Sequence, residues 1–127
     1  MLRTLVVDDD ESIRRLLTVV LSLNPQIRVV GEAGDGSSAV SLIGELRPDV
    51  VILDHAMPGR TGASIVPILK EVLPKADVIF FSAYVGNPDC SCDLSSMAED
   101  YGCYLLSKEE VDRLEILLNE LNYRRMN

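Results

Sequence analysis

The chain has 127 residues, the size of one ordinary domain, and its 47% hydrophobic and 25% charged residues form a globular balance that can bury a core. A formal net charge of −8 disfavours binding to nucleic acid and suits divalent cations or basic partner surfaces. No apolar run approaches the roughly 20 residues that a membrane span needs, and the N-terminal residues lack the pattern of a signal peptide. We therefore expect one cytoplasmic domain over residues 1–127 that binds neither nucleic acid nor membrane.

Short apolar runs alternate along the chain with segments of helical periodicity. The apolar runs, expected to be strands, are Leu5–Val7, Ile27–Gly31, Val50–Leu53, Asp77–Phe81 and Tyr104–Leu106. The helical patterns are Ser12–Leu23, a segment capped at Ser37 or Ser38 and reaching Leu46, Ile65–Leu73, a weak one over Met97–Tyr101, and Glu109–Tyr123. Strands that are apolar throughout and separated by helices indicate an α/β fold, with one parallel sheet covered by helices on both faces.

Polar side chains follow the predicted strands at the end of the sheet where ligands bind in such folds. In chain order they are Asp8, Asp9 and Asp10 after the first strand, Asp54 after the third, Ser82 after the fourth and Lys108 beyond the fifth. Clustered carboxylates resist joint ionisation unless a cation lies among them, and Mg²⁺ prefers such oxygen ligands. A carboxylate beside Mg²⁺ can attack phosphorus and form an acyl phosphate, while an ammonium and a hydroxyl hold the other phosphoryl oxygens.

With these residues in place, the sequence resembles the receiver domain of bacterial two-component response regulators along almost its full length. The matching pieces are Leu5–Glu11, Val30–Gly36, Arg47–Asp54, Met57–Gly59 with Gly62, Ser82–Ala83 and Lys108. The stretch from Val30 to Leu53 is most similar to receivers of helix-turn-helix transcription regulators. The resemblance implies a flavodoxin-like (βα)5 fold, a doubly wound five-stranded parallel sheet with strand order 2-1-3-4-5.

The resemblance also implies a magnesium site and an acceptor. Asp54 would accept the phosphoryl group and contribute to binding Mg²⁺. Asp9 would bind Mg²⁺ directly, and Asp8 either directly or through water. The backbone carbonyl of Ala56 would supply a further ligand.

Two more residues and the function follow from the same resemblance. The Ser82 hydroxyl would move toward the phosphoryl group, and Lys108 would pair with the phosphorylated Asp54. The implied function is a phosphorylation-dependent switch that a sensor histidine kinase or a phosphotransfer protein loads, and that changes its surface from the fourth strand to the fifth helix. A homodimer on phosphorylation is a further expectation. Such a domain phosphorylates and dephosphorylates itself but is not a metabolic enzyme, and it can stand alone or precede other domains.

The chain departs from the family pattern between Ser82 and Lys108. These residues are 26 positions apart (108 minus 82), more than is usual, and the excess falls in residues 86–96. We therefore expect the fourth helix to be displaced or partly unfolded. Glu109 stands where the family commonly has a proline in a cis bond. Leu105 occupies the position of the family's switch aromatic, and Tyr104 beside it should point to the other face of the sheet.

Other readings remain open at this point. A haloacid-dehalogenase-like phosphatase would use Asp8 as its nucleophile in the pattern Asp8-x-Asp10-x-Ser12, and a receiver-shaped binding module would never be phosphorylated. The three cysteines do not form a disulfide framework, which favours reduced thiols. The arginine pairs at positions 14–15 and 124–125 are expected to be a solvated helix face and a solvated tail.

Overall fold

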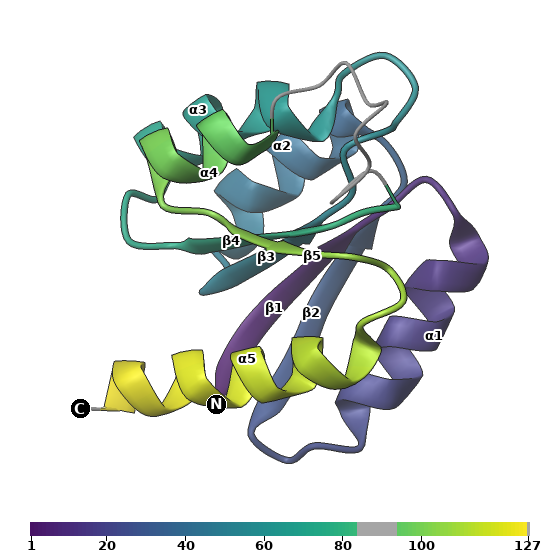
Figure 1. Ribbon diagram of the computed structural model, residues 1–127, viewed down its shortest axis with the longest axis vertical. Coiled ribbons are helices and arrows are strands. Elements are labelled where there is room, and N and C mark those ends of the chain that lie inside the picture. The colour runs from purple at the N-terminus through teal and green to yellow at the C-terminus, as the bar shows by residue number, and fades with distance from the viewer. Residues whose placement is uncertain (84–93, 127) are drawn as a thin grey trace.

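The computed structural model describes residues 1–83 and 94–126, which form five strands and five helices (Figure 1). In chain order the elements are β1 (Leu2–Val7), α1 (Glu11–Ser22), β2 (Ile27–Ala33), α2 (Gly36–Leu46), β3 (Val50–Leu53), α3 (Gly62–Val72), β4 (Asp77–Phe81), α4 (Leu94–Tyr101), β5 (Tyr104–Leu106) and α5 (Val111–Met126). Most of the stretch 86–96, including Cys90 and Cys92, lies outside the described residues. The fourth helix itself is formed and begins three residues before the predicted Met97.

The five strands make one parallel sheet in the order β2-β1-β3-β4-β5. This confirms the predicted doubly wound fold and its strand order. The register brings the ends of the central strands to within one residue of one another, because Leu53 pairs with both Val7, the last residue of β1, and Phe80, the last but one of β4. The carboxyl ends of β1, β3 and β4 therefore meet at one edge, here called the carboxyl edge.

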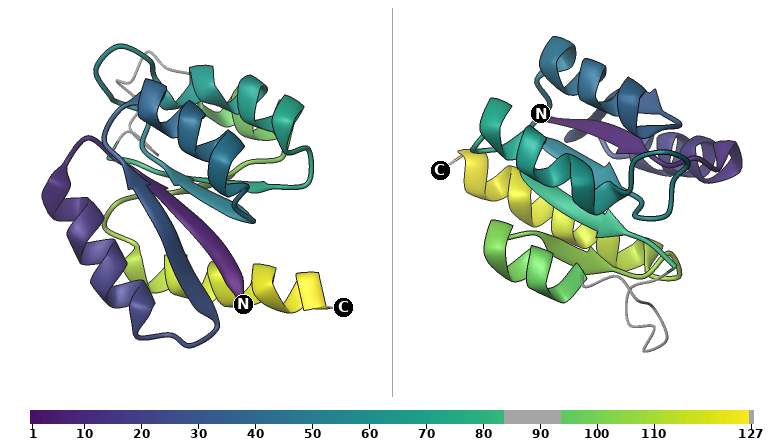
Figure 2. Two further views of the ribbon diagram at one scale, coloured as in Figure 1. Left: turned by 180° about the vertical axis from the view of Figure 1, so that it is seen from behind. Right: turned by 90° about the horizontal axis from the view of Figure 1, so that it is seen from above.

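The sheet separates two hydrophobic cores. Helices α2, α3 and α4 cover one face, and α1 and α5 cover the other (Figures 1 and 2). Alternate residues of each strand point to opposite cores, so Val51 and Leu53 pack under α2 and α3 while Val50 and Ile52 face α1 and α5. Phe80 is the largest of the fully buried side chains. The central strands β3 and β4 read as nearly continuous apolar runs because both of their faces are buried.

Side-chain oxygens of three residues cap the helix starts nearest the carboxyl edge. Asp10 accepts the Ser12 amide at 2.9 Å, so α1 begins at Glu11. Asp35 accepts the Ser38 amide at 2.8 Å, which makes the predicted serine cap of α2 wrong. A carboxylate one residue before the helix is an equally good acceptor and also complements the helix dipole. Thr61 caps α3.

The opposite edge of the sheet, where the strands begin, is here called the amino edge. Three polar side chains attach the C-terminal half of α5 to it, and together they are called the α5 polar stripe: Asn119, Asn122 and Arg125. The side-chain oxygen of Asn119 accepts a hydrogen bond from the side-chain amide of Asn24 at 2.7 Å. The side-chain amide of Asn122 donates to the side-chain oxygen of Gln26 at 3.3 Å. Positions three residues apart lie on one helix face, so the stripe meets the loops before the strands along a single line.

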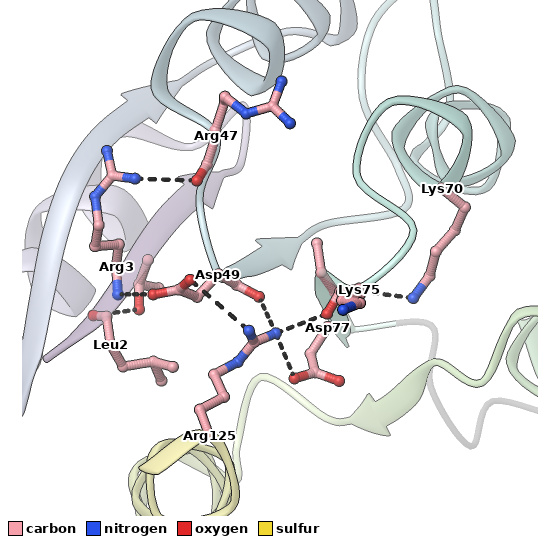
Figure 3. A network of polar contacts seen from close by, with 10 residues as sticks. Leu2, Arg3, Arg47, Asp49, Lys70, Lys75, Asp77 and Arg125 are labelled. Atoms are coloured by element: carbon pink, nitrogen blue, oxygen red, sulfur yellow. Dashed lines mark hydrogen bonds and ion pairs between the residues drawn. The ribbon is translucent and has the colours of Figure 1, made fainter.

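Arg125 forms the last contact of the α5 polar stripe (Figure 3). Its Nη2 donates to the carbonyl oxygens of Lys75 at 2.8 Å and Asp49 at 2.9 Å, and contacts the Asp77 carboxylate at 3.1 Å. The expectation of a solvated tail is wrong for Arg125, whose side chain is 29% exposed, and holds for Arg124, which is 60% exposed.

Among the helices in the described part of the chain, none is both long enough and apolar enough to cross a membrane.

Candidate functional site

The predicted acidic residues lie together at the carboxyl edge. Asp8 and Asp9 follow β1 and Asp54 follows β3, and one carboxylate oxygen of each lies within 4.8 Å of the other two. Backbone hydrogen bonds extend the sheet past the strand ends, because the Asp8 amide donates to Ala33 at 3.0 Å and the Asp54 amide to Val7 at 2.9 Å. The acidic residues are thus held by the sheet itself rather than by a free loop.

Lys108 joins this cluster from the loop after β5. Its Nζ lies 2.8 Å from Oδ2 of Asp8 and 3.3 Å from Oδ2 of Asp54. Burial works against the lysine charge, but the two carboxylates outweigh it and raise the pKa of Lys108. The ammonium therefore stays protonated between two buried carboxylates.

Asp54 is a buried carboxyl in an unfavourable place for a negative charge. Its burial is the main cause that raises its pKa, and the charge of Asp8 adds to it, against the opposing effects of Lys108 and of a hydrogen bond from Ser82. Ser82 is fully buried, and its amide donates to the Leu106 carbonyl at 3.1 Å, which ties the end of β4 to β5. The structure thus brings the Ser82 side chain into hydrogen-bond contact with Asp54, the predicted acceptor.

The donor set fits a small divalent cation. Three carboxylates cluster around one ammonium, so negative charge remains in excess. The charge of Asp8 adds to burial in raising the Asp54 pKa. Asp8 and Asp54 are buried whereas Asp9 is exposed, so a cation there could keep the several waters that Mg²⁺ retains. Ala56, the predicted carbonyl ligand, lies two residues after Asp54 in the β3–α3 loop and is partly buried.

Gly62 allows the start of α3 to approach the backbone of Asp54 closely. Gly62 donates its amide to the His55 carbonyl at 2.8 Å, and a Cβ at Gly62 would lie 2.3 Å from the Asp54 carbonyl oxygen. Only a residue without a side chain allows this approach. Gly62 was part of the family resemblance, but sequence reasoning gave it no role.

His55 follows Asp54 in the loop before α3 and is partly buried. Its ring meets Phe80 edge to face, with centroids 6.5 Å apart, and its Nδ1 accepts the Ala63 amide at 3.4 Å. Burial lowers the pKa of His55, which agrees with an imidazole whose Nδ1 acts as an acceptor.

The two arginines predicted to form a solvated face on α1 behave differently. Arg15 is 76% exposed and pairs with Glu11 along the helix, as expected. The expectation is wrong for Arg14, which is 19% exposed and reaches the Asp8 carbonyl. Helical spacing carried a signal for this, since Arg14 lies three residues before the buried Leu17 and shares its face.

The two residues at the switch position of β5 point to opposite faces, as predicted. Leu105 packs with the core under α2, α3 and α4. Tyr104 packs with the core under α1 and α5, and its hydroxyl accepts a hydrogen bond from Arg124 at 3.4 Å.

Sequence relatives with curated descriptions match most of the chain. A protein-glutamate methylesterase/protein-glutamine glutaminase of Myxococcus xanthus is 42% identical over 65% of this chain and 23% of its own length. The transcriptional regulatory protein LiaR of Bacillus subtilis is 36% identical over 67% of this chain and 40% of its own length. A methylesterase/glutaminase of Pyrococcus horikoshii is 31% identical over 94% of this chain and 32% of its length. The chain thus spans less than half of each of these relatives.

Solved structures agree with the fold over nearly the whole chain. The response regulator domain of Thermotoga maritima CheB superimposes with a TM-score of 0.85 at 25% identity, covering 97% of both chains. The receiver domain of a Francisella response regulator gives 0.82 at 28% identity, covering 98% of this chain and 99% of the other. The family model described as the response regulator receiver domain matches residues 4–115. By this match, and with an acidic cluster and a lysine at the carboxyl edge of its sheet, the chain belongs to the receiver domain family of two-component response regulators.

Proposed function

We propose that this receiver domain accepts a phosphoryl group on Asp54, with Mg²⁺, from a sensor histidine kinase or a phosphotransfer protein in the cytoplasm. The observation that carries the proposal is a pair of buried carboxylates, Asp8 and Asp54, bridged by the Lys108 ammonium at 2.8 Å and 3.3 Å. A third carboxylate, Asp9, lies at the exposed side of the same cluster. Buried charged residues are nearly always paired, and a cluster of ionisable groups with perturbed pKa values is typical of a functional site.

The residues divide the chemistry between them. Mg²⁺ held by Asp8, Asp9, Asp54 and the carbonyl of Ala56 would screen the negative charges of acceptor and donor from one another. A carboxylate oxygen of Asp54 attacks phosphorus and forms the new O–P bond. The bond between phosphorus and the donor atom breaks, and its electron pair leaves with the donor.

Lys108 and Ser82 then hold the transferred group. The Lys108 ammonium is already within reach of Asp54, so it can pair with a phosphoryl oxygen after a small movement. The Ser82 hydroxyl donates to another. Because the Ser82 amide is hydrogen-bonded to the Leu106 carbonyl, a movement of Ser82 would also displace β5. This coupling supports a change in the surface from β4 to α5. Homodimer formation on phosphorylation and the lack of direct nucleic-acid binding stay predictions.

The test is the intact mass of the protein after incubation with acetyl phosphate and Mg²⁺. We expect a gain of one phosphoryl group in the wild type, and none with a chelator or in Asp54→Asn. The alternative phosphatase mechanism, with Asp8 as nucleophile, predicts turnover of a phosphomonoester that Asp8→Asn abolishes and Asp54→Asn retains.

A short-lived adduct would escape the mass measurement, so beryllofluoride with Mg²⁺ provides the second arm. We expect shifts in the amide spectrum of residues at the carboxyl edge and along β5 in the wild type. A protein that gives neither a phosphoryl adduct nor these shifts would be a receiver-shaped binding module.

A further inference from the structure

Arg14 connects three separate segments at the acidic cluster. It belongs to α1, and its Nη1 donates to the backbone carbonyl of Asp8 at 2.6 Å, beyond the end of β1. Its Nε lies 3.4 Å from the carboxylate of Glu32, on β2. The neighbouring Arg15 reaches neither segment, since it projects into solvent and pairs with Glu11.

The chain leaves room for the Arg14 guanidinium at one glycine. A Cβ on Gly34, just after β2, would lie 3.0 Å from Nη1 and 3.5 Å from Cζ of Arg14. The backbone of Gly34 is not in the left-handed region, so its conformation does not require glycine. The guanidinium therefore fills the space that a side chain at position 34 would take.

The contact with Arg14 completes the fixation of Asp8. One carboxylate oxygen of Asp8 accepts the Asp10 amide at 2.9 Å, and the other lies 2.8 Å from Lys108. Arg14 holds the third acceptor of this residue, its backbone carbonyl. A charge-assisted bond to a carbonyl is about twice as strong as a neutral one, so the loss of Arg14 would release the turn that carries Asp8 and Asp9.

We propose that Arg14 is a positioning residue that fixes the Asp8–Asp9 turn in the geometry in which its carboxylates converge on Asp54, and that it thereby strengthens Mg²⁺ binding. The inference rests on the magnesium site of the proposed function. Partners outside the ligand shell typically contribute 10- to 100-fold to metal affinity. Because Arg14 acts on a backbone carbonyl rather than on a ligand oxygen, we expect an effect at the low end, roughly tenfold.

Charge alone predicts the opposite sign. A fixed positive charge near a cation site weakens cation binding, so removing Arg14 for its charge would tighten Mg²⁺ binding. Glu32 pairs with the guanidinium and limits that repulsion. The direction of the change in affinity thus separates positioning from a general electrostatic effect.

The experiment is a titration of the metal-free protein with MgCl2 at constant ionic strength, followed by the amide resonances of residues 8–10 and 54. In Arg14→Met and in Gly34→Ala, which displaces the guanidinium without removing it, the dissociation constant should rise roughly tenfold. In the matched control Arg15→Met it should change by less than about twofold, as for a screened surface charge. Unchanged or tighter binding in both Arg14→Met and Gly34→Ala would overturn the proposal, even if both variants unfold at lower temperature.

A second measurement keeps the inference separate from the proposed function. If the wild type itself fails to bind Mg²⁺, the proposed function fails, and hydrogen exchange of the Asp10 amide in metal-free protein decides the role of Arg14. This amide donates to the Asp8 carboxylate, so it should exchange faster in Arg14→Met and Gly34→Ala than in Arg15→Met. Equal exchange in all three variants would refute the positioning role.

Discussion

The contact between Arg125 and the amino edge of the sheet makes a quantitative prediction about stability. Replacement of Arg125 by methionine keeps the aliphatic part of the side chain and removes the guanidinium. The guanidinium contacts two backbone carbonyls, of Asp49 and Lys75, and the carboxylate of Asp77. The variant therefore tests whether a polar contact holds the end of α5.

The magnitude follows from what each acceptor loses. Hydrogen bonds to charged groups contribute about 1.5–3 kcal/mol when buried, but Arg125 is 29% exposed, so water replaces part of each. The Asp49 carbonyl also keeps the Asp77 amide, which donates to it at 3.0 Å. We therefore expect Arg125→Met to lower the free energy of unfolding by about 2 kcal/mol in total. For a chain of this length that corresponds to a fall in Tm of roughly 5–10 °C.

The neighbouring arginine supplies the control. Arg124 is 60% exposed, and its polar side-chain contacts with the described residues are long, 3.6 Å to Glu120 and 3.4 Å to the Tyr104 hydroxyl. Arg124→Met should cost less than about 0.5 kcal/mol. The assay is urea denaturation followed by circular dichroism, with both variants at the same ionic strength. Equal losses in the two variants would show that the contacts of Arg125 do not hold α5.

Three further predictions concern other substitutions. Gly62→Ala should destabilise the protein by about 1–3 kcal/mol, because its Cβ would lie 2.3 Å from the Asp54 carbonyl oxygen. Gly44→Ala, in the open interior of α2, should instead stabilise the protein by about 0.5–1 kcal/mol. Urea denaturation compares the two variants, and equal effects would contradict the close approach at Gly62. Arg47 ends α2 in the left-handed region with φ of 48°, so Arg47→Gly should raise Tm in a thermal melt, with a gain of about 0.5–1 kcal/mol. Since the pKa of Asp54 is raised, the folded protein favours the protonated carboxyl; this contribution to stability is complete below the unfolded pKa of about 3.9 and is lost as pH rises through the folded value. Asp54→Asn should therefore gain stability relative to the wild type as pH rises, and Mg²⁺ should reduce that gain; denaturation midpoints from pH 4 to pH 8 that stay parallel would rule this out.

Much of the fold was accessible from local patterns because both faces of the central strands are buried. The run Val50–Leu53 had to be a central strand, and the carboxylate that follows it had to lie at the edge of the sheet. The strand order could not be predicted from local patterns. Periodicity says that strands are buried but not which strands are neighbours, so the order came only from the family resemblance.

The contacts that the long arginine side chains make were not predicted, and there is a physical reason. Arg14 and Arg125 were assigned to solvent because arginine is usually exposed, yet each continues the buried stripe of its helix. Arg125 lies four residues after the buried Leu121, as Arg14 lies three before Leu17. An arginine on such a stripe can bury its stem and carry its charge to a distant carbonyl. Which carbonyl it meets depends on loops far away in the sequence, and no local pattern contains that information.

The α5 polar stripe has a consequence for recombining this domain with its relatives. Its partners are spread over three loops: Asn24 and Gln26 precede β2, Asp49 precedes β3, and Lys75 and Asp77 precede or begin β4. A chimera that joins residues 1–110 to the last helix of another receiver could still match the leucines of the core. It would nevertheless leave the carboxylates of Asp49 and Asp77, and the side-chain amides of Asn24 and Gln26, without the α5 side chains that contact them here. The last helix is therefore not an exchangeable module here, and a graft that works must carry Asn119, Asn122 and Arg125 with it.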